Sequence, residues 1–300
     1  MIKEIFEGHD TRGEWRPKFA DLPPLFLWPL KPFKILKWII GFPGYLFPWN
    51  ALMMGISIVV WFFLTPELSR MKTFEIGWVT TIYIRNVILL FIIAGILHLH
   101  FYTRKSQDVR YKYNDKWLRK NHPGFLFRNQ TWENIFWSLI SGCGVWTAFE
   151  ILTFWMFAND YVPYLEFRSQ PLYFILLFLA IPLIRDFHFY LVHRLLHCPL
   201  LYKSAHYLHH KNTRIGPWSG LSMHPIEHLL YFTGVLLHWF LLSHPLHAIF
   251  HLQHAGLSAA IGHTEFEVLE MNDGTRFPGP GSYYHYLHHR HFQCNYGGSL

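Results

Sequence analysis

Residues 171–210 read PLYFILLFLAIPLIRDFHFYLVHRLLHCPLLYKSAHYLHH and combine the two features that decide the fold. The apolar run 171–184 is followed by RDFHFYLVHRLLH, which stays compatible with a helix, and then by closely spaced histidines. The apolar run alone is short enough to be either a buried helix or part of a membrane span, but the continuation lengthens it. We therefore predict a helix that crosses the bilayer and carries histidines where it leaves it.

The composition of the whole chain agrees with an embedded protein. Of its 300 residues, 51% are hydrophobic and only 15% are charged, which excludes an ordinary soluble or disordered chain. The chain has 22 histidines, and all but His9, His98, His100 and His122 lie at or beyond His188. The formal charge of +7 comes from Lys and Arg residues that flank apolar segments, so it indicates membrane orientation and no nucleic-acid partner.

The cysteines and the basic residues indicate a compartment and an orientation. Cys143, Cys198 and Cys294 show no paired spacing, which favours reduced thiols over a disulfide framework or a cysteine metal cluster. The segment 103–130 carries the densest series of basic residues, and the positive-inside rule therefore places it in the cytoplasm.

Other apolar segments predict the rest of an all-α, integral-membrane helical bundle. Residues 45–64, 78–101 and 135–158 join 171–184 as about four transmembrane helices, and 229–242 with 245–262 form a helical hairpin. Residues 25–40 mix lysines and aromatics, as expected at the lipid headgroups. Arg85 lies in the first half of its span, where it either snorkels to the near interface or makes a polar contact inside the protein, and we favour snorkelling. Five histidines of the hairpin are expected to make helix-to-helix hydrogen bonds.

Four histidine motifs stand out. On a helix, residues at i, i+3 and i+4 are neighbours, so each motif can aim two or three imidazoles at one point. A bound cation would keep such closely packed rings neutral, whereas without it they repel one another when protonated. Three of the motifs contain eight histidines, which two metals with about four imidazoles each would explain. These three motifs are HRLLH (His193, His197), HYLHH (His206, His209, His210) and HYLHH (His285, His288, His289). The fourth motif, HPIEH, adds His224 and His228.

Imidazole suits iron, zinc, copper and nickel alike, so the residue type does not identify the metal. The metal has to be inferred from the chemistry that the site performs. A two-zinc hydrolase needs carboxylates beside its metals. Few carboxylates lie near the motifs in the sequence: Asp186, Glu227, Glu265 and Glu267. A protein that transports or senses metals would have ligands distributed along several membrane spans, whereas these histidines lie beyond the ends of the spans. A site at the membrane face has access to lipid, whose saturated carbons require activated oxygen, so iron with O2 fits best.

The same residues resemble the fatty acid hydroxylase/sterol desaturase superfamily of integral-membrane di-iron oxygenases. The resemblance covers about residues 132–298 and includes D-x6-H-x3-H from Asp186, the HP element at His224, and HYLHHRHFQCNYG from His285 to Gly297. It implies two iron ions, O2 as co-substrate, and electrons from NAD(P)H through a cytochrome b5 or ferredoxin type donor. It also implies that the enzyme hydroxylates or desaturates a lipid.

The resemblance carries the ligand role onto ten histidines and a supporting role onto one carboxylate. His263, in GHTE, and His224 join the eight motif histidines as expected metal ligands. Asp186 lies seven residues before His193 and is expected either to orient a ligand imidazole or to pair with Arg185 or Arg194. The family usually continues beyond NYG into a segment with tryptophan and aspartate, whereas this sequence ends at Leu300.

We accordingly divide the chain into three parts. Residues 1–44 are expected to form an N-terminal cytoplasmic or interfacial segment, 45–131 a transmembrane hairpin with the basic loop, and 132–300 a fatty acid hydroxylase-like catalytic domain. The parity of the spans places the histidine motifs on the cytoplasmic face of a multi-pass protein. The membrane would be a bacterial inner membrane or the endoplasmic reticulum, and the expected partners are the lipid substrate and the electron donor.

Overall fold

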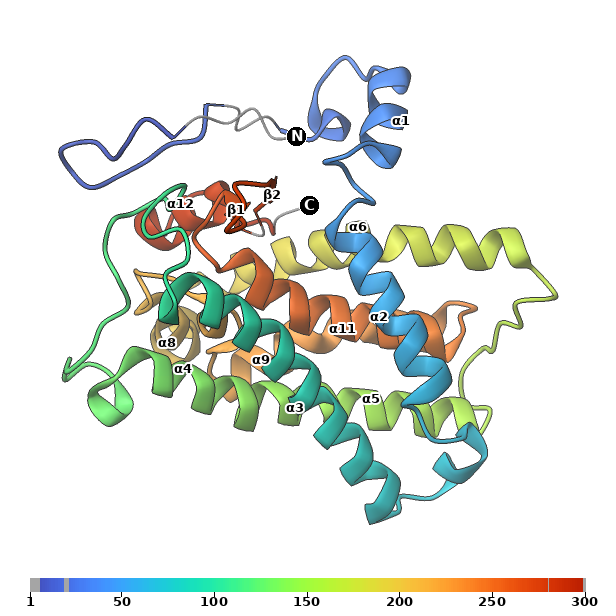
Figure 1. The fold of residues 1–300 in the computed structure, drawn as a ribbon. Helices are drawn as coiled ribbons and strands as arrows, with labels where there is room; N and C mark the ends of the chain where they lie inside the picture. Colours follow the sequence, from blue (N-terminus) through green and yellow to red (C-terminus); the bar gives the residue numbers. More distant parts are fainter. Residues whose placement is uncertain (1–5, 19–21, 280, 299–300) are drawn as a thin grey trace.

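The computed structural model describes residues 6–18, 22–279 and 281–298, and these form a bundle of helices (Figure 1). A short helix α1 (Pro32–Ile40) precedes α2 (Trp49–Phe63) and α3 (Ile76–His98), which continues as one π-helical turn to Thr103. Then α4 (Gln130–Trp137) and α5 (Cys143–Ala158) run on through a π-helical turn, Ser138–Gly142. The long α6 (Pro171–Leu196) follows.

Three of these helices are long and apolar enough to cross a membrane. They comprise Ile76–Thr103, Gln130–Ala158 and Pro171–Leu196, and much of their surface faces outward from the protein. This arrangement confirms the predicted fold class, a helical membrane protein, and it confirms that the apolar run from residue 171 continues as helix to the first histidine motif.

The first predicted span is shorter than expected. Helix α2 has 15 residues, which cover about 22 Å at about 1.5 Å per residue, less than the roughly 30 Å of hydrocarbon.

The predicted hairpin is interrupted in its first arm. It consists of α9 (Pro225–Phe232), a 3-10 turn (Thr233–Leu236) and α10 (Leu237–Phe240), and then α11 (Pro245–Gly262).

Helix α11 forms the centre of the bundle. Nearly all its residues are buried, and it packs against α2, α3, α5 and α6 (Figure 1). One hydrophobic cluster joins Met53 of α2, Leu90 of α3 and Trp146 of α5 to Phe250 of α11. Because the surrounding helices all contact the same apolar helix, their ends are held in fixed relative positions.

Arg85 does not snorkel to the interface, which corrects our expectation. Its guanidinium is buried and forms an ion pair with Glu150 of α5, and Asn86 Nδ2 donates to the same carboxylate at 2.9 Å. An unpaired charge in apolar surroundings is costly, so a carboxylate on the facing helix stabilises this position better than a long reach to water.

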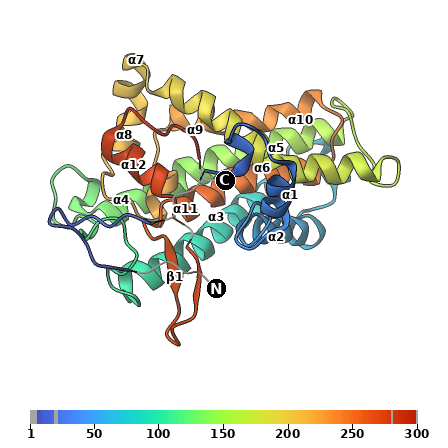
Figure 2. The same ribbon diagram turned by 90° about the horizontal axis from the view of Figure 1, so that it is seen from above.

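The remaining elements gather at one end of the bundle, away from the α5–α6 connection (Figures 1 and 2). They include α7 (Pro199–Leu201), a π-helical turn (Tyr202–His206), α8 (Tyr207–His210) and α12 (Tyr283–His291). A small antiparallel sheet pairs β1 (Val268–Glu270) with β2 (Arg276–Pro278). The segment 104–129 lies at the same end.

Candidate metal centre

Nine histidines converge at this end in two adjoining groups. In each group the ring nitrogens that face one another all lie within 4.8 Å. Ring centroids of His210 and His289, one from each group, are 4.9 Å apart. We call the groups A (His193, His197, His206, His210, His288) and B (His209, His263, His285, His289).

Helical periodicity explains how each HYLHH motif serves both groups. Successive residues of a helix point about 100° apart, so i and i+4 share a face while i+3 faces aside. His206 and His210 therefore point into group A and His209 into group B. In α12 the same spacing sends His285 and His289 into group B and His288 into group A. Sequence spacing predicted that these rings converge, but not that each triplet divides between two sites.

The chain turns back sharply between the first two motifs. Pro199 starts α7 and cannot continue α6, and Cys198 before it is extended (φ −60°, ψ 139°). The π-helical turn Tyr202–His206 then leads into α8, which places His206 beside His193, with ring centroids 5.0 Å apart. At the other motif, Ser282 Oγ accepts from His285 N–H and caps α12.

Acceptors behind the rings fix their orientation. Nδ1 of His193 lies 2.8 Å from the carbonyl of Tyr296, and Nδ1 of His288 lies 2.5 Å from the carbonyl of Cys294. Nδ1 of His206 lies 2.8 Å from Glu227 Oε1. In group B, Nδ1 of His263 lies 2.7 Å from the carbonyl of Ala259. These oxygens only accept, so each Nδ1 carries a hydrogen and each neutral ring presents a lone pair at Nε2.

The Nε2 atoms that present these lone pairs face other ring nitrogens. His197 Nε2 lies 3.2 Å from Nε2 of both His206 and His288, and it can donate a hydrogen to only one of them. The buried Nε2 of His193 has no hydrogen-bond partner among the described residues. Hydrogen bonds among the rings cannot satisfy this set, whereas a cation accepts several lone pairs at once. The residues of group A therefore fit a metal ion.

Group B shows the same feature. His263 Nε2 lies 3.1 Å from Nε2 of both His285 and His289, although its one lone pair can accept only one well-formed hydrogen bond. All four rings of this group are buried. Both groups thus offer imidazole nitrogens alone, a donor set that suits iron, zinc, copper or nickel.

Burial favours the neutral form of most of these rings. It lowers the pKa of His197 to about 3 and the pKa values of His263 and His288 to about 4. Burial, and then the neighbouring imidazoles, also lower the pKa of His209 and His289 well below the ordinary value. Neutral imidazole is the form that binds metals, so the site is prepared for a cation.

Two predicted site residues lie outside both groups. His224 caps α9, and its Nδ1 accepts from the N–H of Ile226 at 3.3 Å. Asp186 Oδ1 accepts from the N–H of Gly298 at 2.8 Å. The carboxylate therefore holds the backbone two residues beyond Tyr296, whose carbonyl accepts from His193. Histidines 238, 247, 251 and 254 of the predicted hairpin form hydrogen bonds within the bundle and belong to neither group.

The partners behind the rings could not be named from sequence. Glu227 is 21 residues from His206 along the chain, and no local spacing links them. The Cys294 and Tyr296 carbonyls come from the FQCNYG segment, whose side chains gave no hint that its backbone supports two ligands. The remaining carboxylates contact neither group: Glu265 pairs with Lys112, and Glu267 Oε2 accepts from the Tyr113 hydroxyl at 2.5 Å.

Fold and site together define a helical membrane protein with two adjoining all-histidine sites that could each hold a metal ion. Comparison with known proteins narrows this class. Residues 178–300 match the fatty acid hydroxylase family model, which confirms the resemblance to the fatty acid hydroxylase/sterol desaturase superfamily.

Relatives with names agree with the family match. A Dictyostelium discoideum protein named for methylsterol monooxygenase activity is 31% identical over 127 residues, 39% of this chain and 44% of its own length. A Delta(7)-sterol 5(6)-desaturase of Eremothecium gossypii is 30% identical over 138 residues, 45% of this chain and 35% of its own length. The matched part therefore spans less than half of either relative. No solved structure matches the chain significantly.

Proposed function

We propose that the chain is a membrane di-iron oxygenase that hydroxylates or desaturates a lipid with O2 and two electrons. The observation that carries the proposal is the pair of adjoining, all-imidazole groups at the end of a bundle with three membrane-length apolar helices. The sterol substrates in the names of the two relatives support a lipid, be it a sterol, a fatty acyl chain or a related compound.

Each protein group has a defined task in this proposal. Two iron ions, one in group A and one in group B, would supply the activation of dioxygen when bound. Glu227 and the carbonyls of Tyr296 and Cys294 hold the Nδ1 hydrogens and so direct Nε2 of three group A rings inward. Burial of eight of the nine rings limits the access of water to the centre, and only His197 among them is partly exposed.

Two other functions fit the site less well. A two-zinc hydrolase needs carboxylates among its ligands, but group A and group B contain only histidines, and Glu227 contacts the outward-facing Nδ1 of His206. A metal transporter or sensor would place ligands along the membrane-crossing helices, whereas here they gather at one end of the bundle.

The proposal includes a location and a donor. We place the protein in the bacterial inner membrane or the endoplasmic reticulum as a multi-pass protein, with the site on the cytoplasmic face, as the basic segment 103–130 at the same end favours. The electrons come from NAD(P)H through a cytochrome b5 or ferredoxin type donor. The division at residues 44 and 131, with the catalytic part at 132–300, is also part of this proposal.

The test combines metal analysis with lipid analysis. Purified protein should contain two iron ions per chain, and host lipids should gain a species with one added oxygen or two fewer hydrogens when the protein is present. His288→Ala should abolish the product and lower the iron content, whereas His291→Ala, an exposed neighbour outside both groups, should retain both. Zinc in place of iron, with cleavage of a lipid by water that needs neither O2 nor a reductant, would show a hydrolase and contradict the proposal.

A further inference from the structure

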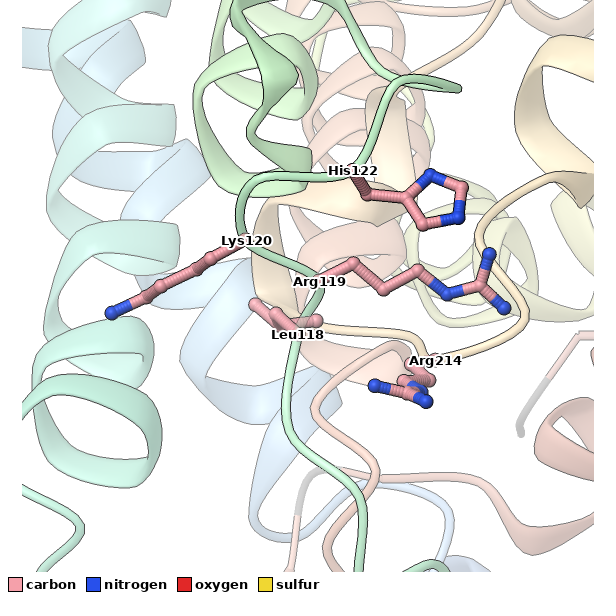
Figure 3. A pocket seen from close by; sticks show the side chains of 5 residues that line it. All are labelled: Leu118, Arg119, Lys120, His122 and Arg214. Atoms are coloured by element: carbon pink, nitrogen blue, oxygen red, sulfur yellow. The ribbon is translucent and has the colours of Figure 1, made fainter.

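A basic pocket lies beside the metal centre and takes no part in it. It has a volume of about 420 Å³ and is lined by Leu118, Arg119, Lys120, His122 and Arg214. Figure 3 shows that the nitrogen-bearing ends of Arg119, His122 and Arg214 lie on one side, while Lys120 extends in the opposite direction. Three of the lining side chains carry a positive charge and none carries a negative charge.

Hydrogen bonds through Gln130 hold the two segments of this pocket together. The backbone N–H of Arg119 donates to Gln130 Oε1 at 2.9 Å, and Gln130 Nε2 donates to the carbonyl of Arg214 at 2.6 Å. Gln130 Nε2 also donates to Asn212 Oδ1 at 2.9 Å, and Asn212 Nδ2 donates to the carbonyl of His209 at 3.2 Å. The two arginines are thus positioned by a buried amide and not by solvent contacts alone.

The pocket has more hydrogen-bond donors than the protein uses. Arg119 donates to Thr213 Oγ1 at 3.2 Å, and Arg214 donates to the carbonyl of Trp117 at 2.9 Å, so each guanidinium has further N–H groups for a ligand. His122 Nδ1 accepts from Gly124 N–H at 3.1 Å, which leaves its Nε2 hydrogen for an acceptor. In the part of the chain that the structure describes, neither arginine forms an ion pair.

Such a donor set fits a phosphate group. Two guanidinium groups and one imidazole N–H recognise a tetrahedral anion with several acceptor oxygens better than they recognise a single carboxylate. The remaining question is whether the phosphate belongs to a soluble compound or to a lipid.

Exposed apolar residues that follow the pocket in the chain favour a lipid. Leu126, Phe127 and Trp132 are 47%, 66% and 60% exposed, and they follow His122 at the point where the chain enters its second membrane-length helix. The N–H of His122 donates to the carbonyl of Arg128 at 3.0 Å, so this turn folds back against the pocket. Exposed aromatic and aliphatic side chains beside cationic ones are typical of the level where headgroups meet acyl chains.

We propose that this pocket binds the phosphate group of an anionic phospholipid, with Arg119, Arg214 and His122 on the headgroup and the exposed apolar turn against the acyl chains. The site stands on its own contacts and does not depend on which metal the histidines bind.

Binding of soluble probes to the purified full chain in nonionic detergent tests the proposal. Isothermal calorimetry would compare dioctanoyl phosphatidic acid, inorganic phosphate and dioctanoylglycerol. We expect dioctanoyl phosphatidic acid to bind, dioctanoylglycerol not to bind, and inorganic phosphate to bind more weakly. Equal binding of inorganic phosphate and the lipid would overturn the assignment to a lipid headgroup.

Matched variants test the residues. Arg119→Gln with Arg214→Gln should weaken binding of dioctanoyl phosphatidic acid by about tenfold or more, because two charge-assisted contacts are lost. The control variant, Arg70→Gln with Arg168→Gln, removes the same charge from two exposed arginines outside the pocket and should bind as the wild type does. Equal affinity of the two double variants would overturn the pocket assignment.

A second measurement uses the wild-type protein and does not depend on the folding of a variant. Phenylglyoxal modifies accessible arginines, and peptide mass spectrometry reports the modified positions. Dioctanoyl phosphatidic acid should protect Arg119 and Arg214 but leave Arg168, in the distant α5–α6 connection, as reactive as before. Unchanged modification of Arg119 and Arg214 would contradict the proposal.

Discussion

Among single residues, Glu227 has the most direct influence on a candidate ligand. Its Oε1 accepts from His206 Nδ1 at 2.8 Å, and both side chains are buried. A carboxylate in this position fixes the tautomer and increases the basicity of Nε2. We therefore expect Glu227→Ala to lower metal affinity by about 10- to 100-fold and Glu227→Gln, which retains an acceptor, to lower it less.

Competition with a chelator, followed by metal analysis, measures this effect. Glu166→Ala, in the α5–α6 connection, is the matched control because it removes a carboxylate at the end of the bundle opposite to groups A and B and should leave metal affinity unchanged. Wild-type affinity in Glu227→Ala would contradict the orienting role.

His228 predicts how stability depends on pH. Its Nδ1 accepts from Ser141 Oγ at 2.9 Å and its Nε2 donates to the carbonyl of Leu221 at 3.1 Å, so the ring is neutral with both nitrogens paired. Burial lowers the pKa of His228 to about 3. Between the unfolded pKa of about 6.5 and pH 3, only the unfolded state takes up this proton, so the free energy of unfolding falls as the pH falls.

A variant isolates the contribution of His228 to this dependence. The advantage of the wild type over His228→Asn should shrink by about 1.4 kcal/mol for each pH unit below about 6.5. Denaturant unfolding in detergent from pH 7 to pH 5 measures it, and His291→Asn, an exposed position, should follow the wild-type curve. Parallel curves for wild type and His228→Asn would show that the ring is not buried as a neutral group.

Among the structural elements, the segment after α12 connects the second HYLHH motif to α6. Gly298 N–H donates to Asp186 Oδ1, and a Cβ at Gly298 would lie 2.4 Å from that oxygen. Gly298→Ala should therefore displace the Asp186 carboxylate and break its hydrogen bond to the segment, which loosens the position of the Tyr296 carbonyl beside His193. We expect about 1–3 kcal/mol of destabilisation, as is usual for overpacking, together with weaker metal binding.

Gly297 offers a closely matched comparison, since a Cβ there meets no atom within 4 Å. Gly297→Ala should therefore bind metal as the wild type does and unfold at the same temperature. Thermal unfolding and chelator competition on the two variants test the contact, and identical behaviour would mean that the Asp186–Gly298 contact does not position the segment.

How much could be predicted from sequence differs among the elements. The apolar run and helical spacing predicted α6 and the convergence of HRLLH and HYLHH, because both depend on residues close together in the chain. Spacing separates the middle histidine of each triplet from the outer two, but which group each of them joins depends on how α8 and α12 face each other, which spacing does not determine. Arg85 was misassigned for the same reason: its partner, Glu150, lies on another helix 65 residues away.

At the scale of the whole molecule, the two histidine groups join parts of the chain that are far apart in the sequence. Group A takes ligands from α6, α8 with its preceding turn, and α12, and group B adds His263 after α11. A ligand that binds only the folded state stabilises it in proportion to the logarithm of its concentration over its dissociation constant. Metal removal should therefore loosen the elements that have few other contacts.

The helices differ in the contacts that would remain without a metal. Helix α12 carries three of the nine imidazoles and otherwise packs in a small cluster around Tyr286, whereas α3 and α5 share the buried Arg85–Glu150 pair and a large apolar cluster with α11. We expect hydrogen exchange after metal removal to rise strongly in residues 283–291 and little in α3 and α5. Mass spectrometry of the metal-loaded and chelated protein measures the difference. A uniform rise across all helices would instead show that the bundle depends as a whole on the metal, and an unchanged α12 would show that its imidazoles bind none.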